Sequence, residues 1–197
     1  MRAMHTLKVH VNEGNPKAKN ADPKDATPEL LADLTVQRVF SKFLSGPAAK
    51  AAIEAAYRKL DPDPEGPATA VPLLQVARLG FAAVVNGDAE YGMTLGNRAM
   101  GGKDARARAW GEFITAHIGL EAAVPQAGKG SCKITKGDVS KLCRALEEME
   151  SCLQAFACLD DIAGIHATCR CEHVYDSSIQ MCMICLHAAL PSRAVFG

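Results

Sequence analysis

Apolar residues recur at helical spacing over most of the chain between residues 27 and 123. A typical helix start is the tripeptide Thr27-Pro28-Glu29, which supplies a hydroxyl cap, a proline at the first helical position and an acid in the first turn. The apolar residues that follow are spaced three or four positions apart, which places them on one face of an α-helix. The pattern predicts helices over residues 27–44, 47–60, 73–85 and 104–123.

Polar, glycine-rich and proline-rich segments separate the periodic ones. Residues 1–26 are mostly polar and indicate a flexible N-terminal arm. Residues 88–103 are rich in glycine, and their pattern does not distinguish a helix from a loop. Residues 124–137 combine glycine with small and polar residues, which is typical of a hinge. The interval 27–123 between the arm and the hinge is therefore expected to be a small, Ala-rich helical domain.

A heptad pattern follows the hinge, over residues 138–160. Apolar residues there alternate steps of three and four positions for about two and a half repeats, which predicts one amphipathic helix. Two interpretations are open: the apolar seam packs on the chain's own domain, or it pairs with a second copy in a homodimer. The members of this heptad seam are Val139, Leu142, Leu146, Met149, Leu153 and Phe156.

Composition and charge narrow the class of function. The chain is 48% hydrophobic and 22% charged, as globular proteins are, and its formal net charge is zero. A protein that coats nucleic acid needs a surplus of cations, so the charge balance disfavours that function. One local basic excess, Arg98, Lys103, Arg106 and Arg108, lies close to Trp110. It is either a phosphate-binding face with a tryptophan that stacks on a base, or a solvated helix face over a buried tryptophan.

Neither a membrane span nor a secretion signal is predicted. The longest apolar stretch is interrupted by Gln75 and Arg78, and no apolar segment follows the N-terminal methionine. We therefore expect a cytoplasmic or nuclear protein that is not secreted.

The cysteines concentrate the candidate chemistry in the last part of the chain. All eight lie between residues 132 and 185, and six potential ligands fall within residues 169–187. Thiolate and imidazole are the ligands that Zn²⁺ prefers, and closely spaced pairs can chelate one tetrahedral ion. We predict a zinc-stabilised cysteine-rich module over residues 161–197, in which zinc binding contributes to folding. The candidate ligands are Cys169, Cys171, Cys182, Cys185, His173 and His187.

The run Met181-Cys182-Met183-Ile184-Cys185-Leu186 resembles the opening of a RING finger. The resemblance covers about the last sixteen residues, and only Cys182 and Cys185 match a RING ligand pair. It implies that Ile184 and Leu186 form an apolar shelf for a ubiquitin-conjugating enzyme. The alternative is that both pack inward against Leu190, Val195 and Phe196 and form the core of the module.

A second, architectural resemblance is to the cysteine-rich regulatory proteins of plant RNA viruses, which combine a zinc cluster with a short coiled coil. It rests on the run Cys171 to Tyr175 and implies suppression of RNA silencing.

The sequence as a whole predicts a mainly α protein without a catalytic constellation of its own. We expect a zinc-binding regulatory or adaptor protein that acts by protein–protein interaction. The alternatives are a RING-type ubiquitin ligase with an incomplete ring and a viral silencing suppressor.

Overall fold

A computed structural model describes residues 26–64, 66, 71–123 and 136–169 of the chain. The described part is mainly α-helical, as the sequence predicts. Its helices are α2 (Pro28–Phe40), α3 (Gly46–Leu60), α4 (Leu73–Val85), α5 (Ala89–Met100), α6 (Ala105–Ala123) and α7 (Lys136–Cys158). A short helix over residues 162–169 follows α7. The predicted flexible arm and most of the predicted hinge lie outside the described residues.

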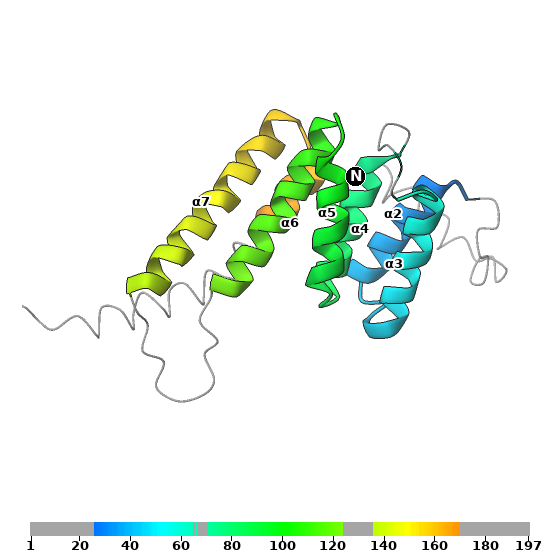
Figure 1. The fold of residues 1–197 in the computed structure, drawn as a ribbon, viewed down its shortest axis with the longest axis horizontal. Coiled ribbons are helices and arrows are strands. Elements are labelled where there is room, and N and C mark those ends of the chain that lie inside the picture. The colour runs from blue at the N-terminus through cyan, green and yellow to red at the C-terminus, as the bar shows by residue number, and fades with distance from the viewer. Residues whose placement is uncertain (1–25, 65, 67–70, 124–135, 170–197) are drawn as a thin grey trace, which may run out of the picture.

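The helices lie side by side in a row that runs from α2 and α3 at one end to α7 at the other (Figure 1). Each helix packs against its neighbours in sequence, and α4 also packs against both α2 and α6. Helix pairs that contact only nearby pairs form the arrangement of α-solenoids, which present long surfaces rather than one central cavity. The row is therefore stabilised by successive interfaces between adjacent helices.

Aromatic side chains connect the interfaces of this row. Phe81 on α4 lies 5.5 Å from Phe40 on α2 and 4.9 Å from Phe113 on α6, measured between ring centroids. Phe113 lies 5.8 Å from Phe156 on α7. Phe113 and Phe156 are fully buried, and each pair has the tilted or edge-to-face geometry that aromatic rings prefer. One aromatic chain thus crosses the molecule from α2 to α7.

The glycine-rich segment, whose conformation the sequence pattern left open, forms helix α5. Asp88 caps it by accepting a hydrogen bond from the backbone N–H of Tyr91 at 3.2 Å. The glycines allow the backbones of adjacent helices to approach closely. A Cβ at Gly92 would lie 2.8 Å from the carbonyl oxygen of Gly80 on α4, and a Cβ at Gly111 on α6 would lie 2.7 Å from that of Gly96.

Alanine substitutions at two glycines of α6 are expected to have opposite effects on the stability of the fold. Gly111→Ala would place a methyl group against the backbone of α5, and overpacking of this kind costs about 1–3 kcal/mol. Gly119→Ala meets no atom within 4 Å and should stabilise the helix by about 0.5–1 kcal/mol. Urea denaturation followed by circular dichroism measures both. Equal shifts of the two midpoints would contradict the close approach of α5 and α6.

The heptad seam of α7 packs inside the chain. Leu142, Met149 and Phe156 are buried in the same core cluster as residues of α4 and α6, and half-buried Leu146 packs against that cluster. Leu153 is half-buried, and the side chain of Val139 lies outside the described residues. Because α6 of the same chain covers the buried members of the seam, the structure favours a packed helix over a homodimer through this seam.

Residues beyond α7 return to the same core. Asp161 accepts a hydrogen bond from the backbone N–H of Gly164 at 3.0 Å and so caps the helix over 162–169. A Cβ at Gly164 would collide with the ring of Phe156. Thr168 is fully buried, and its hydroxyl donates to the carbonyl oxygen of Gly164 at 2.9 Å. The segment that we predicted to begin a separate tail at residue 161 therefore packs on the helical row as far as Thr168.

Candidate functional site

Most of the predicted zinc ligands lie outside the part of the chain that the structure describes. Cys171, His173, Cys182, Cys185 and His187 fall beyond residue 169, as do Ile184 and Leu186 of the predicted RING-like shelf. Cys169 is described and exposed, at the end of the short helix. Within the described ranges, no group of three or more His, Cys, Asp or Glu side chains could hold a metal ion.

The cysteines that the structure describes are all free thiols, and they differ in exposure. Cys143 and Cys158 on α7 are exposed, whereas Cys152 between them is buried in the core. Burial raises the pKa of the Cys152 thiol to about 11. A thiol with so high a pKa is protonated at neutral pH, so Cys152 acts as a packing residue rather than as a ligand or nucleophile.

Some of the residues in the local basic excess form contacts that stabilise the fold. Arg106 donates to the carbonyl oxygen of Leu159 at 3.0 Å and so joins the start of α6 to the end of α7. Trp110 is 3% exposed and cannot stack on a base. The tryptophan is thus buried, as one interpretation predicted, and the base-stacking part of the alternative is wrong because Trp110 lies in the core.

Arg98 on α5 forms a buried ion pair with Asp61, at the end of α3. Its Nε donates to Asp61 Oδ2 at 2.8 Å, its Nη2 donates to Oδ1 at 3.3 Å, and its Nη1 donates to the carbonyl oxygen of Gly66 at 2.8 Å. The hydroxyl of Tyr57 donates to the same carboxylate, and burial together with Asp61 raises the pKa of Tyr57 to about 12. The pair fixes the end of α3 and Gly66 against α5.

A second buried polar cluster joins three distant segments, and we call Arg78, Trp110 and Asp161 the corner cluster. Trp110 Nε1 on α6 donates to Asp161 Oδ2 at 2.9 Å. The guanidinium of Arg78 on α4 lies 3.9 Å from Asp161 Oδ1 and 5.7 Å from the centroid of the Trp110 ring. Arg78 also lies 3.9 Å from Asp33 on α2. The cluster therefore ties the chain after α7 to the first helices of the row.

Sequence reasoning missed the role of the corner cluster. Arg78 interrupts an otherwise apolar helix, and Asp161 follows the last heptad position, so both were visible as polar residues in apolar surroundings. Buried charges need partners. That rule could have identified Arg78 and Asp161 as members of ion pairs, but not as each other's partner.

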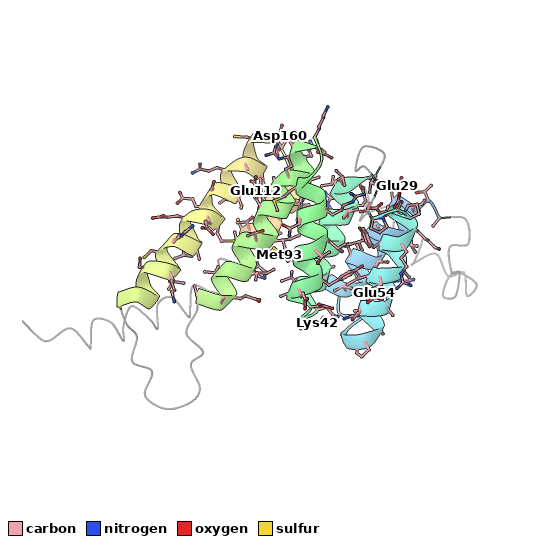
Figure 2. All side chains as sticks on the ribbon, in the orientation of Figure 1. Glu29, Lys42, Glu54, Met93, Glu112 and Asp160 are labelled. Atoms are coloured by element: carbon pink, nitrogen blue, oxygen red, sulfur yellow. The ribbon has the colours of Figure 1, made fainter. Side chains whose placement is uncertain are left out.

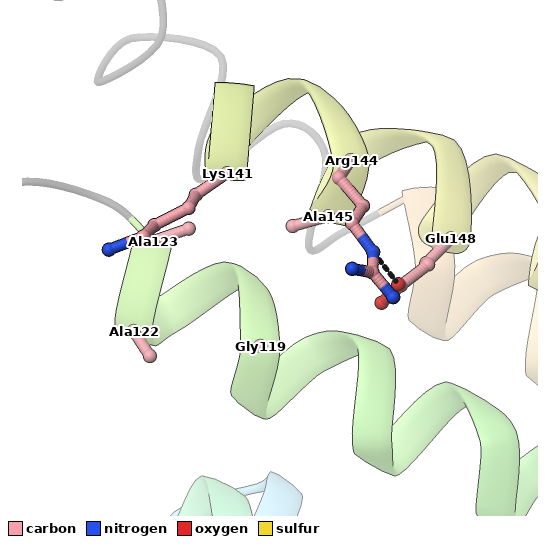
Figure 3. Close-up of a pocket in the computed structure, with 7 residues that line it drawn as sticks. All are labelled: Gly119, Ala122, Ala123, Lys141, Arg144, Ala145 and Glu148. Atoms are coloured by element: carbon pink, nitrogen blue, oxygen red, sulfur yellow. Dashed lines mark hydrogen bonds and ion pairs between the residues drawn. The ribbon is translucent and has the colours of Figure 1, made fainter. Parts of the chain in front are cut away.

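One shallow groove lies between the end of α6 and the start of α7 (Figure 3). Its volume is about 340 Å³, and Gly119, Ala122 and Ala123 form the α6 side. On the α7 side Arg144 donates to Glu148 at 3.1 Å. The rest of the lining is Lys141 and Ala145, so the groove presents small side chains, one lysine and one exposed ion pair.

His117 on α6 is the one buried histidine among the described residues. Its ring stacks on Phe113 with centroids 6.0 Å apart, and its Nε2 lies 3.6 Å from Glu121. Burial lowers the pKa of His117 below its ordinary 6.5, and Glu121 opposes this shift. A histidine in this setting is neutral in the folded protein at neutral pH.

We expect His117 to make the folded protein less stable in mild acid. Because its pKa is lower in the folded than in the unfolded chain, the unfolded chain binds more protons below about pH 6.5, and stability falls as pH drops through that range. Urea midpoints between pH 8 and pH 5 measure this slope. His117→Phe keeps an aromatic ring beside Phe113 and should flatten the slope, whereas an unchanged slope would contradict the assignment.

No helix in the described ranges combines the length and the apolar character that a membrane span requires.

Comparison with known proteins gives one match of interest. No family model matches the chain, and no solved structure matches it. The chain is similar to the cilia- and flagella-associated protein 46 of Chlamydomonas reinhardtii, with 30% identity over 138 residues. The alignment covers 68% of this chain but spans only 5% of that relative. The chain thus resembles a small part of a much longer protein that is associated with cilia and flagella.

Proposed function

We propose that this chain is a non-catalytic helical module that binds other proteins within a ciliary or flagellar assembly. The observation that carries the proposal is the row of helices itself. Its successive interfaces leave long exposed surfaces, and large surfaces of this kind suit binding to other proteins. The similarity to a cilia- and flagella-associated protein supplies the cellular setting.

The internal use of charge supports an adaptor rather than an enzyme. Among the residues that the structure describes, the two buried carboxylates, Asp61 and Asp161, are both engaged by arginine side chains, at 2.8 and 3.9 Å. A catalytic carboxylate needs access to substrate, and these two are 2% and 5% exposed. Their role is to hold adjacent segments of the row in a fixed arrangement.

The cysteine-rich tail would add a zinc-stabilised module to the row. Cys169, Cys171, Cys182 and Cys185 are the proposed ligands, and their thiolates suit a closed tetrahedral site that has a structural role. The proposed regulatory or adaptor role then combines a rigid body with a small module for a second contact. A ubiquitin ligase of RING type would use the same cysteines to recruit a conjugating enzyme.

Localisation tests the proposed setting. A tagged copy of the full chain, expressed in the green alga that carries the relative, is expected to stay with flagella after the membrane is removed with detergent. A tag of the same size on an unrelated soluble protein is the control. Uniform distribution in the cell body, with no enrichment in flagella, would contradict the ciliary assignment.

Metal analysis tests the proposed tail. The full chain, purified without chelator, is expected to hold about one zinc ion, as one closed four-ligand site requires. Cys182→Ser should release this zinc, whereas Cys143→Ser on the exposed face of α7 should retain it. Because Cys182 lies beyond the described helices and Cys143 is exposed, the helical melting curve should persist in both variants. A metal-free wild type would contradict zinc binding.

A further inference from the structure

Three large apolar side chains are exposed at one corner of the row. Phe40 at the end of α2 is 38% exposed, Phe43 just after α2 is 84% exposed, and Val85 at the end of α4 is 49% exposed. Phe40 touches Phe81, which lies one helical turn before Val85 on α4. We call these three residues the corner patch, and Phe40 joins the patch to the aromatic chain of the core through its contact with Phe81.

The backbone under the corner patch is held in place by long-range hydrogen bonds. The side chain of Asn86, next to Val85, accepts from the backbone N–H of Gly46 at 2.8 Å and donates to its carbonyl oxygen at 3.0 Å. One turn further along α3, Lys50 forms an ion pair of 2.8 Å with Asp88. The start of α3 and the end of α4 are therefore fixed relative to each other before any partner arrives, which lowers the entropic cost of binding.

The chain takes a rare conformation beside its most exposed aromatic residue. Lys42, which lies at the lower edge of the row in Figure 2, has a φ of +59°. For residues other than glycine, this left-handed conformation is about 1–2 kcal/mol less favourable than the helical one. The conformation turns the chain sharply after α2, directly before Phe43. Across this turn the backbone N–H of Leu44 donates to the carbonyl oxygen of Arg38 at 3.1 Å, the hydrogen bond of a helix C-cap.

The corner patch has a positive flank. Arg38 and Lys42 are both exposed, and neither forms an ion pair with any residue that the structure describes. Nearby Lys50, in contrast, is paired with Asp88. Charges in the open flank of an apolar patch select a partner of opposite sign. This flank therefore selects an acidic partner.

We propose that the corner patch docks an acidic amphipathic helix of another protein. Apolar residues of that helix would contact Phe43 and Val85, and its acidic residues would face Arg38 and Lys42. Helices bind such surfaces through apolar anchors at every third or fourth position. The inference rests on the proposed function, that this chain binds other proteins, and specifies one surface and the chemistry of its partner. So small a patch fits a weak, exchangeable contact.

A peptide probe tests the docking surface directly. The probe is a fluorescein-labelled amphipathic peptide of about 18 residues, five helical turns, with leucine on one face and glutamate on the flanks. Fluorescence anisotropy with the full chain should show saturable binding. Phe43→Ser should weaken it by about tenfold or more, as loss of an aromatic anchor does. Ile162→Ser, a similarly exposed apolar residue at the opposite edge of the row, is the matched control and should leave binding unchanged.

The charge of the partner is tested with a second peptide and a second variant. A peptide with lysine in place of every glutamate should bind wild type more weakly than the acidic peptide. The double variant Arg38→Gln, Lys42→Asn should lose this preference, and asparagine tolerates the left-handed conformation at position 42. Circular dichroism confirms that each variant is folded. Equal binding of both peptides by wild type would overturn the acidic partner.

Other occupants of the patch give different results. Binding of vesicles that contain anionic lipid, lost in Phe43→Ser while the peptide does not bind, would overturn the proposal in favour of a membrane surface. Self-association of wild type in sedimentation, lost in Phe43→Ser, would overturn it in favour of a second copy. Peptide binding that depends on Phe43, in a chain that is not flagellar, would refute the ciliary setting and leave the docking surface intact. A flagellar chain without peptide binding would refute the docking surface alone.

Discussion

Asp161→Ala is expected to destabilise the folded chain by about 3 kcal/mol, since it removes a helix cap and leaves a buried donor without a partner. The carboxylate accepts from Trp110 Nε1 at 2.9 Å and from the backbone N–H of Gly164 at 3.0 Å. Its loss also leaves Arg78 with only Asp33 as an acidic partner in the described part of the chain. Thermal unfolding should shift down by roughly 6–12 °C for a chain of this size.

The neighbouring carboxylate provides the control for this prediction. Asp160 is exposed and has a φ of +50°, which asparagine tolerates as well as aspartate does. Asp160→Asn should change the free energy of unfolding by less than about 0.5 kcal/mol. Equal effects of the two substitutions on the free energy of unfolding would contradict the packing of the 162–169 helix against α4 and α6.

Phe156→Ala is expected to destabilise the chain by about 3–5 kcal/mol, the usual effect of truncating a fully buried aromatic side chain. Phe156 is fully buried, and its ring centroid lies 5.3 Å from that of Trp110 and 5.8 Å from that of Phe113. The backbone of Gly164 also packs on its ring. Because these contacts join α6, α7 and the following helix, the whole row should lose stability in urea denaturation.

The same variant separates the two interpretations of the heptad seam. If the seam packs within one chain, Phe156→Ala lowers the midpoint equally at all protein concentrations. If the seam joined two copies, the variant would convert a dimer into a monomer in sedimentation, and the wild-type midpoint would rise with concentration. Ile162→Ala is the control, because this side chain is 69% exposed and its truncation should have almost no effect.

Local signals in the sequence were enough for most helix positions. Thr27 caps α2 through its side chain, which accepts from the backbone N–H of Leu30 at 3.3 Å, as the tripeptide at the predicted start implied. The four helices predicted between residues 27 and 123 are α2, α3, α4 and α6 of the structure, with ends that agree within a few residues. These features depend on neighbours three or four positions apart, which the periodicity of one sequence displays directly.

Helix α5 shows where local signals failed. Glycine lowers helix propensity by about 1 kcal/mol per residue, so the pattern of a segment with Gly92 and Gly96 did not distinguish a helix from a loop. In the structure the same glycines allow α5 to approach α4 and α6 closely. Packing between helices outweighs the local preference, and a single sequence does not show which backbone will lie opposite.

The candidate sites also divide into one that the sequence indicates and one that only the structure shows. The sequence indicated thiolate and imidazole ligands between Cys169 and His187, and the zinc site remains a prediction because most of these residues lie outside the described part. The sequence did not indicate the corner patch. Phe40 and Phe43 look like core residues in a helical pattern, and only the structure leaves them exposed.

By itself, the sequence determined the mainly α class, the placement of most helices and the amphipathic character of α7, because each of these depends on nearby residues. Only the tertiary structure decided which charges pair and what the heptad seam packs against. Arg98 and Asp61 are 37 positions apart, and Trp110 and Asp161 are 51 apart. Contacts at such separations are set by how the helices pack against one another, and no local pattern in the chain specifies that packing.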